Sequence, residues 1–286
     1  MQTFKNNILA IYAQEGQRWL DLLPSQVQII KNQYHLSNLQ PVKNLSYNYI
    51  LKGFQADKKI ILKIAIDKEA LEKEANALEA FQGVGVPKLY VREKNFLILE
   101  QVLPGSTLKD YFPSKEFNSI EIFCTVLKNL HRINLPKKHG FQSIEKWLVA
   151  LDHDYDIPMM YLAKARALYR ELLRTQPTQI LLHGDLHHEN ILKHHNQWIA
   201  IDPKGVIGDP AFDVCAFIRN PIPDLLGLNN PKDIINQRIN SCAKLLNLSK
   251  MRIYDWFFVE AVLSWLWNLE DNLDPSYFKH LLEMIN

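Results

Sequence analysis

The sequence has few cysteines, and none lies in a paired motif. Cys124, Cys215 and Cys242 are the only three in 286 residues, and they are widely separated in apolar stretches. An odd number without a Cys-x-x-Cys spacing excludes a complete disulfide framework and does not fit a cysteine-rich zinc site. We therefore predict three reduced cysteines in the core.

The chain also lacks an excess of charge of one sign and a long apolar run. Its 33 basic and 31 acidic residues leave a formal net charge of +2, so no basic region predicts nucleic-acid binding. The apolar run at residues 8–13 is too short for a signal peptide or a membrane span. We expect a cytoplasmic protein without a nucleic-acid or membrane partner, and the oligomeric state stays open.

Hydrophobic periodicity predicts a strand-rich first part, residues 1–102. The first forty residues indicate two short amphipathic helices separated by a turn at Pro24 and Ser25. A further helical pattern runs from Asp67 to Gly83. Strands are predicted at residues 42–52, 58–66, 88–92 and 96–101.

The second part, residues 103–286, follows a break at Pro104 and Gly105 and is mainly helical in pattern. Residues 180–202 interrupt it with short apolar pairs around polar turns, which indicate small strands. Helices are predicted at residues 119–131, 143–152, 159–176, 209–217, 231–246, 250–269 and 274–285. The expected fold class is α+β, with an antiparallel-sheet first lobe carrying one key helix and a mainly α-helical second lobe.

The segment from His183 to Asn190, followed by Asp202, is the strongest sign of chemistry. Asp185 and Asn190 have the spacing of a kinase catalytic loop, in which the aspartate is the base and the asparagine binds a metal. Asp202 adds an oxygen ligand of the kind that Mg²⁺ prefers. For either loop residue alone, a polar turn that caps backbone groups is the alternative.

The sequence resembles the aminoglycoside phosphotransferases of the protein-kinase-like superfamily, in particular the streptomycin 6-kinases and hydroxyurea phosphotransferases. The resemblance covers about residues 40–220 and is most specific in residues 183–190 and 201–213. Asp202-Pro203-Lys204 replaces the Asp-Phe-Gly triplet of protein kinases, which argues against a regulated protein kinase.

By this resemblance Asp185 would be the catalytic base, while Asn190 and Asp202 would bind Mg²⁺. Asp213 would brace the catalytic loop, and His183 has a place in the same motif. The motif residue His183 and its neighbours His187, His188, His194 and His195 lack an HExxH frame, so we do not expect a dedicated zinc site.

The resemblance also assigns the ATP-binding residues of the first lobe. Lys63, central in an apolar run, would bind the α- and β-phosphates; a lysine that reaches the sheet edge is the alternative. Glu74 would pair with it, with Glu69 and Glu72 as competitors on the same helix. No Gly-x-Gly-x-x-Gly pattern is present, so the phosphate loop is expected at Ser46, Tyr47 and Asn48. The backbone from Glu100 to Val102 would recognise adenine.

The acceptor is expected in the second lobe, beside Asp185. The candidates mix acidic and aromatic side chains, as a polycationic sugar requires: Glu260, Trp265, Glu270 and Asp271, with Asp152, Asp154 and Asp156 as a further set. Tryptophans packed in the core and solvated acids are the alternative.

The sequence thus predicts an ATP-dependent kinase for a small-molecule hydroxyl, implied by the resemblance to be that of an aminoglycoside such as streptomycin. Hydroxyurea or another metabolite is the second prediction for the acceptor. A catalytically silent nucleotide-binding module is the third. The acceptor position and the choice between ATP and GTP stay open.

Overall fold

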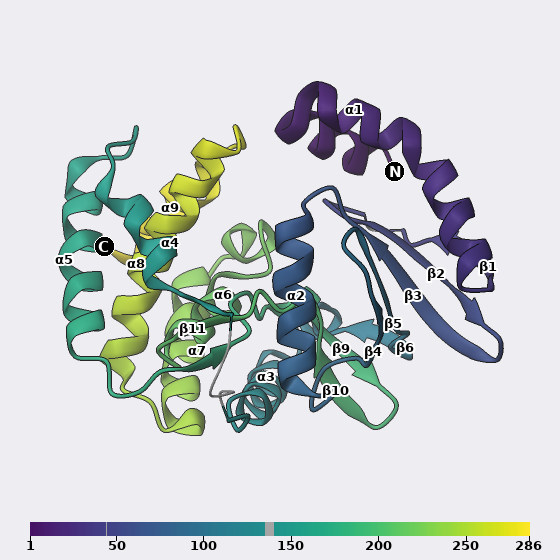
Figure 1. Ribbon diagram of the computed structural model, residues 1–286. Helices are drawn as coiled ribbons and strands as arrows, with labels where there is room; N and C mark the ends of the chain where they lie inside the picture. Colours follow the sequence, from purple (N-terminus) through teal and green to yellow (C-terminus); the bar gives the residue numbers. More distant parts are fainter. Residues whose placement is uncertain (44, 135–139) are drawn as a thin grey trace. The chain divides into compact units, whose positions relative to one another are not determined.

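The computed structural model describes residues 1–43, 45–134 and 140–286, which divide into two compact units. Unit 1 consists of Met1–Gly83 and Pro87–Val102, and unit 2 of Val84–Val86 and Leu103–Asn286. Figure 1 labels the elements of both units. Within the described residues, no helix is long and apolar enough to cross a bilayer.

Unit 1 is built on a five-stranded antiparallel sheet. Its strand order is β1-β2-β3-β5-β4. The strands are β1 (Leu36–Pro41), β2 (Tyr49–Gln55), β3 (Lys58–Ile64), β4 (Leu89–Arg92) and β5 (Phe96–Glu100). The central strands are apolar, and Leu62, Ile64 and Ile98 are fully buried in the core.

The predicted strand at residues 42–52 is wrong in its bounds. The chain forms β1 before it and begins β2 only at Tyr49, while residue 44 lies outside the described part. Strand β1 buries Leu36 and leaves its other side chains exposed or half-buried. The alternation that identifies a strand in a sequence is therefore missing from β1.

Helix α2 (Lys68–Phe81) begins and ends as its residues predict. The side chain of Asp67 accepts a hydrogen bond from the backbone N–H of Ala70 at 2.9 Å, an N-cap. At the other end Gln82 takes the left-handed conformation, and Gly83 follows with φ +72°. The buried face of α2 includes Glu74 among its apolar side chains.

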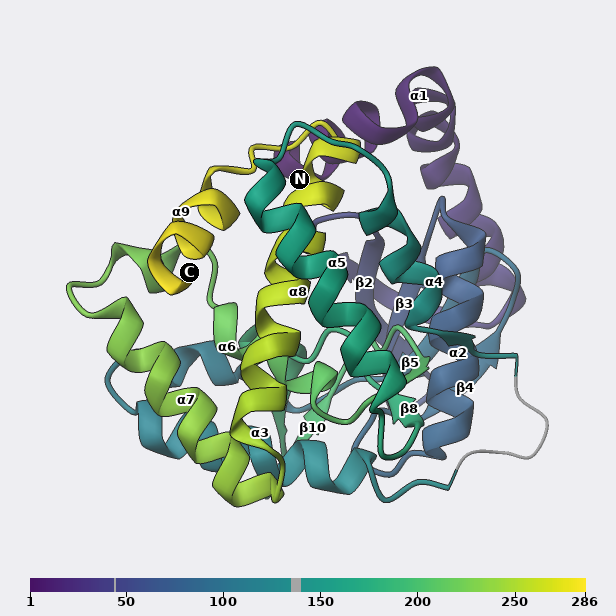
Figure 2. The ribbon, with the colours of Figure 1, turned by 90° about the vertical axis from the view of Figure 1, so that its left-hand side faces the viewer.

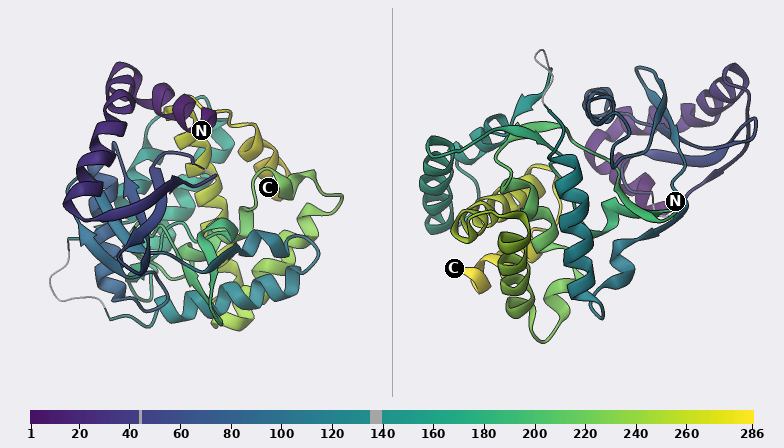
Figure 3. Two further views of the ribbon diagram at one scale, coloured as in Figure 1. Left: turned by 90° about the vertical axis from the view of Figure 1, so that its right-hand side faces the viewer. Right: turned by 90° about the horizontal axis from the view of Figure 1, so that it is seen from below.

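Helix α1 (Gln2–Gln33) breaks at a different residue from the one predicted. Its non-helical residue is Ala13, with φ 45° and ψ −121°, while Pro24 lies inside the helix. The expected turn at Pro24 and Ser25 is therefore wrong. Leu23 and Ile30, on either side of the proline, are buried in one cluster with side chains of the sheet, and this packing explains why the helix continues through it. Figure 3 shows α1 lying along the sheet of unit 1.

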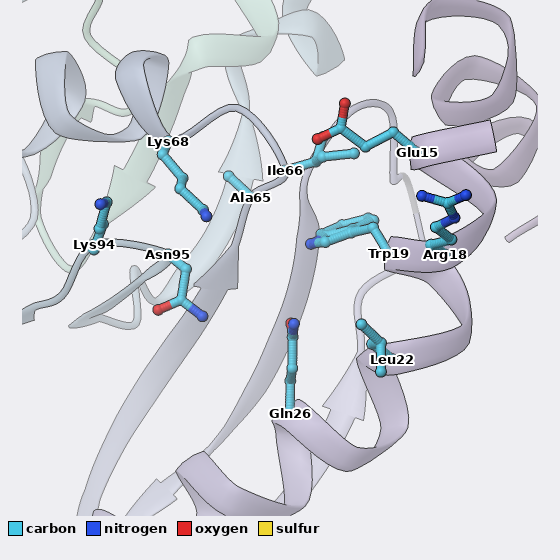
Figure 4. A pocket seen from close by; sticks show the side chains of 10 residues that line it. All are labelled: Glu15, Arg18, Trp19, Leu22, Gln26, Ala65, Ile66, Lys68, Lys94 and Asn95. Atoms are coloured by element: carbon cyan, nitrogen blue, oxygen red, sulfur yellow. The ribbon is translucent and has the colours of Figure 1, made fainter. Parts of the chain in front are cut away.

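A hollow of about 390 Å³ lies in unit 1 between α1, the β3–α2 connection and the β4–β5 turn. Figure 4 shows Trp19 and Gln26 of α1 facing Lys68 and Asn95 across it. Its charged lining residues are Glu15, Arg18, Lys68 and Lys94, and none of them makes an ion pair within the described part of the chain.

Unit 2 is organised around the apolar helix α8 (Lys250–Glu270). Side chains are buried all round it from Trp256 to Leu266, as expected of a helix inside a core. It packs against the other large helices (Figure 2). These are α5 (Met159–Arg174), α7 (Pro231–Leu246) and α9 (Ser276–Ile285), and a further helix, α3 (Glu116–Leu130), contacts α7.

Two three-stranded sheets carry the polar loops of unit 2. One has the order β10-β9-β6 and the other β7-β11-β8. The strands are β6 (Pro104–Thr107), β7 (Gln142–Ser143), β8 (Ile180–Leu182), β9 (Ile191–His194), β10 (Gln197–Ala200) and β11 (Val206–Gly208). Strands β6, β7 and β11 were not predicted, and Pro104 and Gly105, where the pattern breaks, lie within β6.

Two predicted helices of unit 2 are shorter than their patterns indicate. The region 143–152 contains α4 (Glu145–Leu148) and a 3₁₀ turn, Val149–Asp152. The region 209–217 contains a 3₁₀ turn, Phe212–Val214, and α6 (Cys215–Arg219). Helix formation is delayed there because the Asp209 carboxylate accepts a hydrogen bond from the backbone N–H of Ala211 at 2.9 Å, a local turn that competes with a helix.

The three cysteines are free and buried. The Sγ atoms of Cys124 and Cys242 lie 3.8 Å apart between α3 and α7. Burial raises the pKa values of the Cys215 and Cys242 thiols well above that of an ordinary cysteine. Both thiols are therefore protonated core groups of low reactivity.

Candidate active site

A β-hairpin brings two candidate metal ligands together in unit 2. Asn190 immediately precedes β9, and Asp202 follows β10 by two residues. The antiparallel strands pair Ala200 with Ile191, and the N–H of Ile201 donates to the Asn190 carbonyl at 2.9 Å. Residues twelve apart in sequence therefore lie at the same end of one hairpin.

The conformations of both residues are fixed locally. The Asn190 side chain donates from Nδ2 to the carbonyl of Asp185 at 2.9 Å, which leaves its Oδ1 to act as a metal ligand. Asp202 has φ 59°, a left-handed conformation that is costly for a residue with a side chain and is concentrated at functional sites. One amide and one carboxylate oxygen fit Mg²⁺, which takes its remaining ligands from phosphates and water.

Asp213 holds the backbone at the start of the loop His183–Asn190. Its two oxygens accept hydrogen bonds from the backbone N–H groups of His183 at 2.8 Å and Gly184 at 2.7 Å. His131 Nε2 lies 3.0 Å from Oδ2. Burial acts to raise the pKa of Asp213. The hydrogen bond and charge of His131, the charge of His183 and the backbone hydrogen bond of Gly184 act in the opposite direction and outweigh it, so the pKa lies below its ordinary value.

His183 links the two ends of the loop. Its Nδ1 accepts from the Asp185 N–H at 3.3 Å, and its Nε2 donates to the carbonyl of Ile201 at 2.9 Å. Burial lowers the pKa of His183, which matches a neutral ring that uses one nitrogen as acceptor and the other as donor. Gly184 has φ +82°, and a Cβ at this position would lie only 3.1 Å from atoms of Trp147 and Lys204, so a side chain would be both strained and crowded.

Asp185 itself is partly exposed, with 28% of its side-chain surface accessible. Arg219 Nη2 lies 3.8 Å from its Oδ1, and His187 Nε2 lies 4.0 Å from its Oδ2. Sequence reasoning did not identify Arg219. The available signal was a cation that ends the apolar run Cys215–Ile218 and therefore needs a buried partner.

Unit 1 contains a buried ion pair between Lys63 of β3 and Glu74 of α2. The Nζ and Oε2 atoms are 2.6 Å apart, and the two side chains are 3% and 9% exposed. The competing acids have other partners: Glu69 pairs with Lys73, and Glu72 lies 3.6 Å from Arg92. The alternative of a lysine that reaches the sheet edge does not fit this burial.

The other nucleotide candidates of unit 1 lie at the ends of strands. Ser46, Tyr47 and Asn48 form a bend before β2, where the Asn7 side chain donates to the Ser46 carbonyl at 3.2 Å. Glu100 ends β5, and its Oε2 accepts from the Lys88 N–H at 3.2 Å. Val102, two residues further, is buried.

The acceptor candidates fall into two groups. Glu260 and Trp265 are buried within α8, and Glu260 accepts hydrogen bonds from Arg219 Nε at 2.9 and 3.0 Å. Glu270 and Asp271 are exposed at its C-terminal end. There Tyr155 donates to Glu270 at 2.5 Å, and this hydrogen bond, with burial, raises the pKa of Tyr155 to about 12.

Asp152 and Asp154 pair with arginines, and Asp156 is exposed. Asp152 accepts from Tyr169 at 2.7 Å and from Arg170 at 2.9 Å. Asp154 lies 3.2 Å from Arg166. These pairs are mostly exposed and contribute little to stability.

A five-stranded antiparallel sheet with a buried lysine–glutamate pair, together with an Asp-x₄-Asn loop beside a second aspartate, defines a protein-kinase-like phosphotransferase. Residues 34–272 match the family of aminoglycoside/hydroxyurea antibiotic resistance kinases. The chain belongs to this family and is a kinase.

Two relatives of the chain are named for different substrates. The chain is 23% identical over 282 residues to the streptomycin 6-kinase of Streptomyces glaucescens, a match that covers 93% of this chain and 90% of that protein. It is 25% identical over 271 residues to the hydroxyurea phosphotransferase of Kitasatospora aureofaciens, with 90% and 76% covered. The predicted family and branch are confirmed.

Solved structures share the fold. One is a thermostable mutant of an aminoglycoside phosphotransferase in ternary complex with ADP and hygromycin B, with TM-score 0.67, 12% identity and coverage of 90% of this chain and 97% of that one. Another is the choline kinase LicA from Streptococcus pneumoniae, with TM-score 0.67, 14% identity and coverage of 91% and 99%. The α+β protein-kinase-like fold is thus confirmed.

Proposed function

We propose that the chain transfers the γ-phosphate of ATP to a hydroxyl of an aminoglycoside such as streptomycin, in the cytoplasm. The observation that carries the proposal is the arrangement of Asp185, Asn190 and Asp202 around one hairpin on a braced loop. The family, the streptomycin 6-kinase relative and the nucleotide in a structural neighbour support it.

In this proposal Asp185 accepts the hydrogen bond of the acceptor hydroxyl and takes its proton during transfer. The partly exposed carboxylate can reach a substrate, and its backbone is held by Asn190 and His183. Positioning of this kind typically contributes about 10²–10⁴ in rate.

Asn190 Oδ1 and the Asp202 carboxylate would hold Mg²⁺, and Lys63 would bind the α- and β-phosphates. When bound, Mg²⁺ neutralises charge on the phosphates. Glu74 keeps the buried ammonium of Lys63 charged, which phosphate binding requires. The bend at Ser46, Tyr47 and Asn48 and the backbone from Glu100 to Val102 are the proposed contacts to phosphate and adenine.

The acceptor subsite is proposed at the C-terminal end of α8. Trp267 packs on Trp147 with ring centroids 5.6 Å apart, and Trp147 lies against Gly184 beside the proposed base. Glu270 and Asp271 follow on the same helix end. An aromatic wall with two exposed acids suits a cationic sugar. Glu260 and Trp265 also belong to α8, but their side chains are buried, so they would support the acceptor subsite without contacting the acceptor.

Phosphate transfer to a panel of acceptors tests the proposal. Purified protein, Mg²⁺ and γ-labelled ATP are incubated with streptomycin, other aminoglycosides and hydroxyurea, and mass spectrometry locates the phosphate. We expect streptomycin to be labelled by wild type and by a Glu171→Gln control, whose carboxylate pairs with Arg174 at the surface, with the rate at least about 10²-fold lower in Asp185→Asn.

Hydroxyurea is the second candidate acceptor, because one relative is a hydroxyurea phosphotransferase. Labelling of hydroxyurea without streptomycin would move the proposal to that acceptor. Nucleotide binding without transfer to any compound in the panel would support a silent nucleotide-binding module instead.

A further inference from the structure

Arg219 ends helix α6 and lies almost buried, with 13% of its side chain exposed. Both oxygens of Glu260 accept from its Nε, at 2.9 and 3.0 Å. Glu260 is itself buried and also accepts from Ser264 at 3.0 Å. The guanidinium is therefore held at one edge by helix α8, and its rotation is restricted.

The C-terminal helix α9 holds the same residue from another side. Tyr277 donates its hydroxyl hydrogen to the Arg219 carbonyl at 2.5 Å. The ring of Phe278 lies 5.8 Å from the guanidinium carbon, within the range of a cation–π contact. Both residues lie beyond residues 34–272, so an element outside the family match completes the surroundings of Arg219.

The guanidinium also lies beside Asp185. Its Nη2 is 3.8 Å from Asp185 Oδ1, while its Nε donates to Glu260. Burial acts to lower the pKa of Arg219, but the charges of Glu260 and Asp185 outweigh it and raise the pKa, so the residue is a permanent cation. A fixed cation beside one carboxylate oxygen restricts the orientation of that carboxylate.

We propose that Arg219 is a positioning residue for the reaction. Held by Glu260 and α9, it orients the Asp185 carboxylate so that Oδ2 is presented to the acceptor hydroxyl. This inference rests on the proposed role of Asp185 as the base. It extends the active-site support to Glu260 and Tyr277, which act through Arg219 and do not touch substrate.

A double-mutant cycle between Arg219→Gln and Asp185→Asn tests this role. We expect Arg219→Gln to lower kcat about 10–100-fold, since misplacement by about 1 Å can cost 10²-fold, with KM for ATP within about threefold of wild type. Arg219→Lys should recover part of kcat. In the Asp185→Asn background, measured by single-turnover kinetics at high enzyme concentration, Arg219→Gln should change the rate by less than about twofold, because coupled residues are not additive.

Arg252→Gln is the matched control, because Arg252 is another partly buried arginine of unit 2 that pairs with an acid, Asp209. It should lower thermal stability and show no coupling to Asp185→Asn. If Arg219→Gln leaves kcat unchanged, or lowers the Asp185→Asn rate by the same factor as the wild-type rate, the positioning role is overturned. If Asp185→Asn alone retains the wild-type rate, the proposed function fails instead.

Discussion

The buried carboxylate of Asp213 holds two consecutive backbone N–H groups of the catalytic loop at once. An asparagine offers only one acceptor oxygen and presents an NH₂ group to the second N–H. Because both groups are buried, one donor is left without a partner, which typically costs about 1–3 kcal/mol. We expect Asp213→Asn to lower the free energy of unfolding at pH 7 by that amount and to reduce kcat by loosening the loop.

The cost of Asp213→Asn should also depend on pH. The folded-state pKa of Asp213 is below its ordinary value, so its contribution is complete above about pH 4 and is lost as the pH falls through the folded-state pKa. Urea unfolding of wild type and variant at pH 7 and pH 3 measures the difference, which should be smaller at pH 3. A constant difference would mean that the pKa of Asp213 is the same in the folded and the unfolded chain.

Variants of the Lys63–Glu74 pair should affect stability and nucleotide binding differently. Lys63→Met leaves Glu74 buried without its cation, and breaking a buried ion pair in this way typically costs about 3–5 kcal/mol. Replacing both residues, in Lys63→Met/Glu74→Leu, also removes the buried carboxylate and should recover most of that loss in urea unfolding. Neither variant should bind nucleotide with wild-type affinity. If the double variant bound nucleotide normally in calorimetry, Lys63 would have no role in phosphate binding.

At the level of elements, the break in α1 depends on one residue in an unfavourable conformation. Ala13 has φ 45°, where a glycine avoids the cost of a Cβ. We expect Ala13→Gly to raise the free energy of unfolding by about 1 kcal/mol. The control is Ala10→Gly, at an exposed position within the same helix, which should lower stability by about 0.5–1 kcal/mol. Thermal unfolding of the two variants gives opposite shifts if the break is at Ala13, and two losses if it is not.

Long elements with a sustained apolar period were predictable from the sequence, and the shortest strands were not. Helices α5, α7 and α8 have a sustained apolar period and lie within two residues of their predicted bounds. Strands β7 and β11 have two and three residues, too few to show a period, and are fixed by partners distant in sequence. The break of α1 was placed at Pro24 because proline is a strong local signal, but tertiary packing overrides it.

The candidate site was predictable in its loop residues and not in their support. Asp185, Asn190 and Asp202 follow a spacing that a sequence can show. Arg219 lies near Asp185, and Tyr277 donates to Arg219. Both contacts depend on how α6, α8 and α9 pack, and no local sequence pattern encodes them. A buried cation at the end of an apolar run was the only sign of Arg219.

For the whole molecule, the proposed function draws residues from both units: Lys63 belongs to unit 1, and Asn190 and Asp202 belong to unit 2. A nucleotide that binds only the folded chain stabilises it, so Mg-ADP at 100 times its Kd should raise the free energy of unfolding by about 2.7 kcal/mol. Calorimetric unfolding with Mg-ADP, and with ADP plus EDTA, measures the shift.

A substitution in either unit should remove this stabilisation. Lys63→Met, already less stable, should show little further shift on addition of Mg-ADP, and Asp202→Asn should behave with Mg-ADP as wild type does with ADP plus EDTA. The Glu171→Gln control should keep the full shift, since Glu171 pairs with Arg174 at the surface. A full shift in Lys63→Met together with a lost shift in Asp202→Asn would confine nucleotide binding to unit 2, and the opposite result would confine it to unit 1. Loss in both variants is the outcome that a single phosphotransfer reaction served by both units requires.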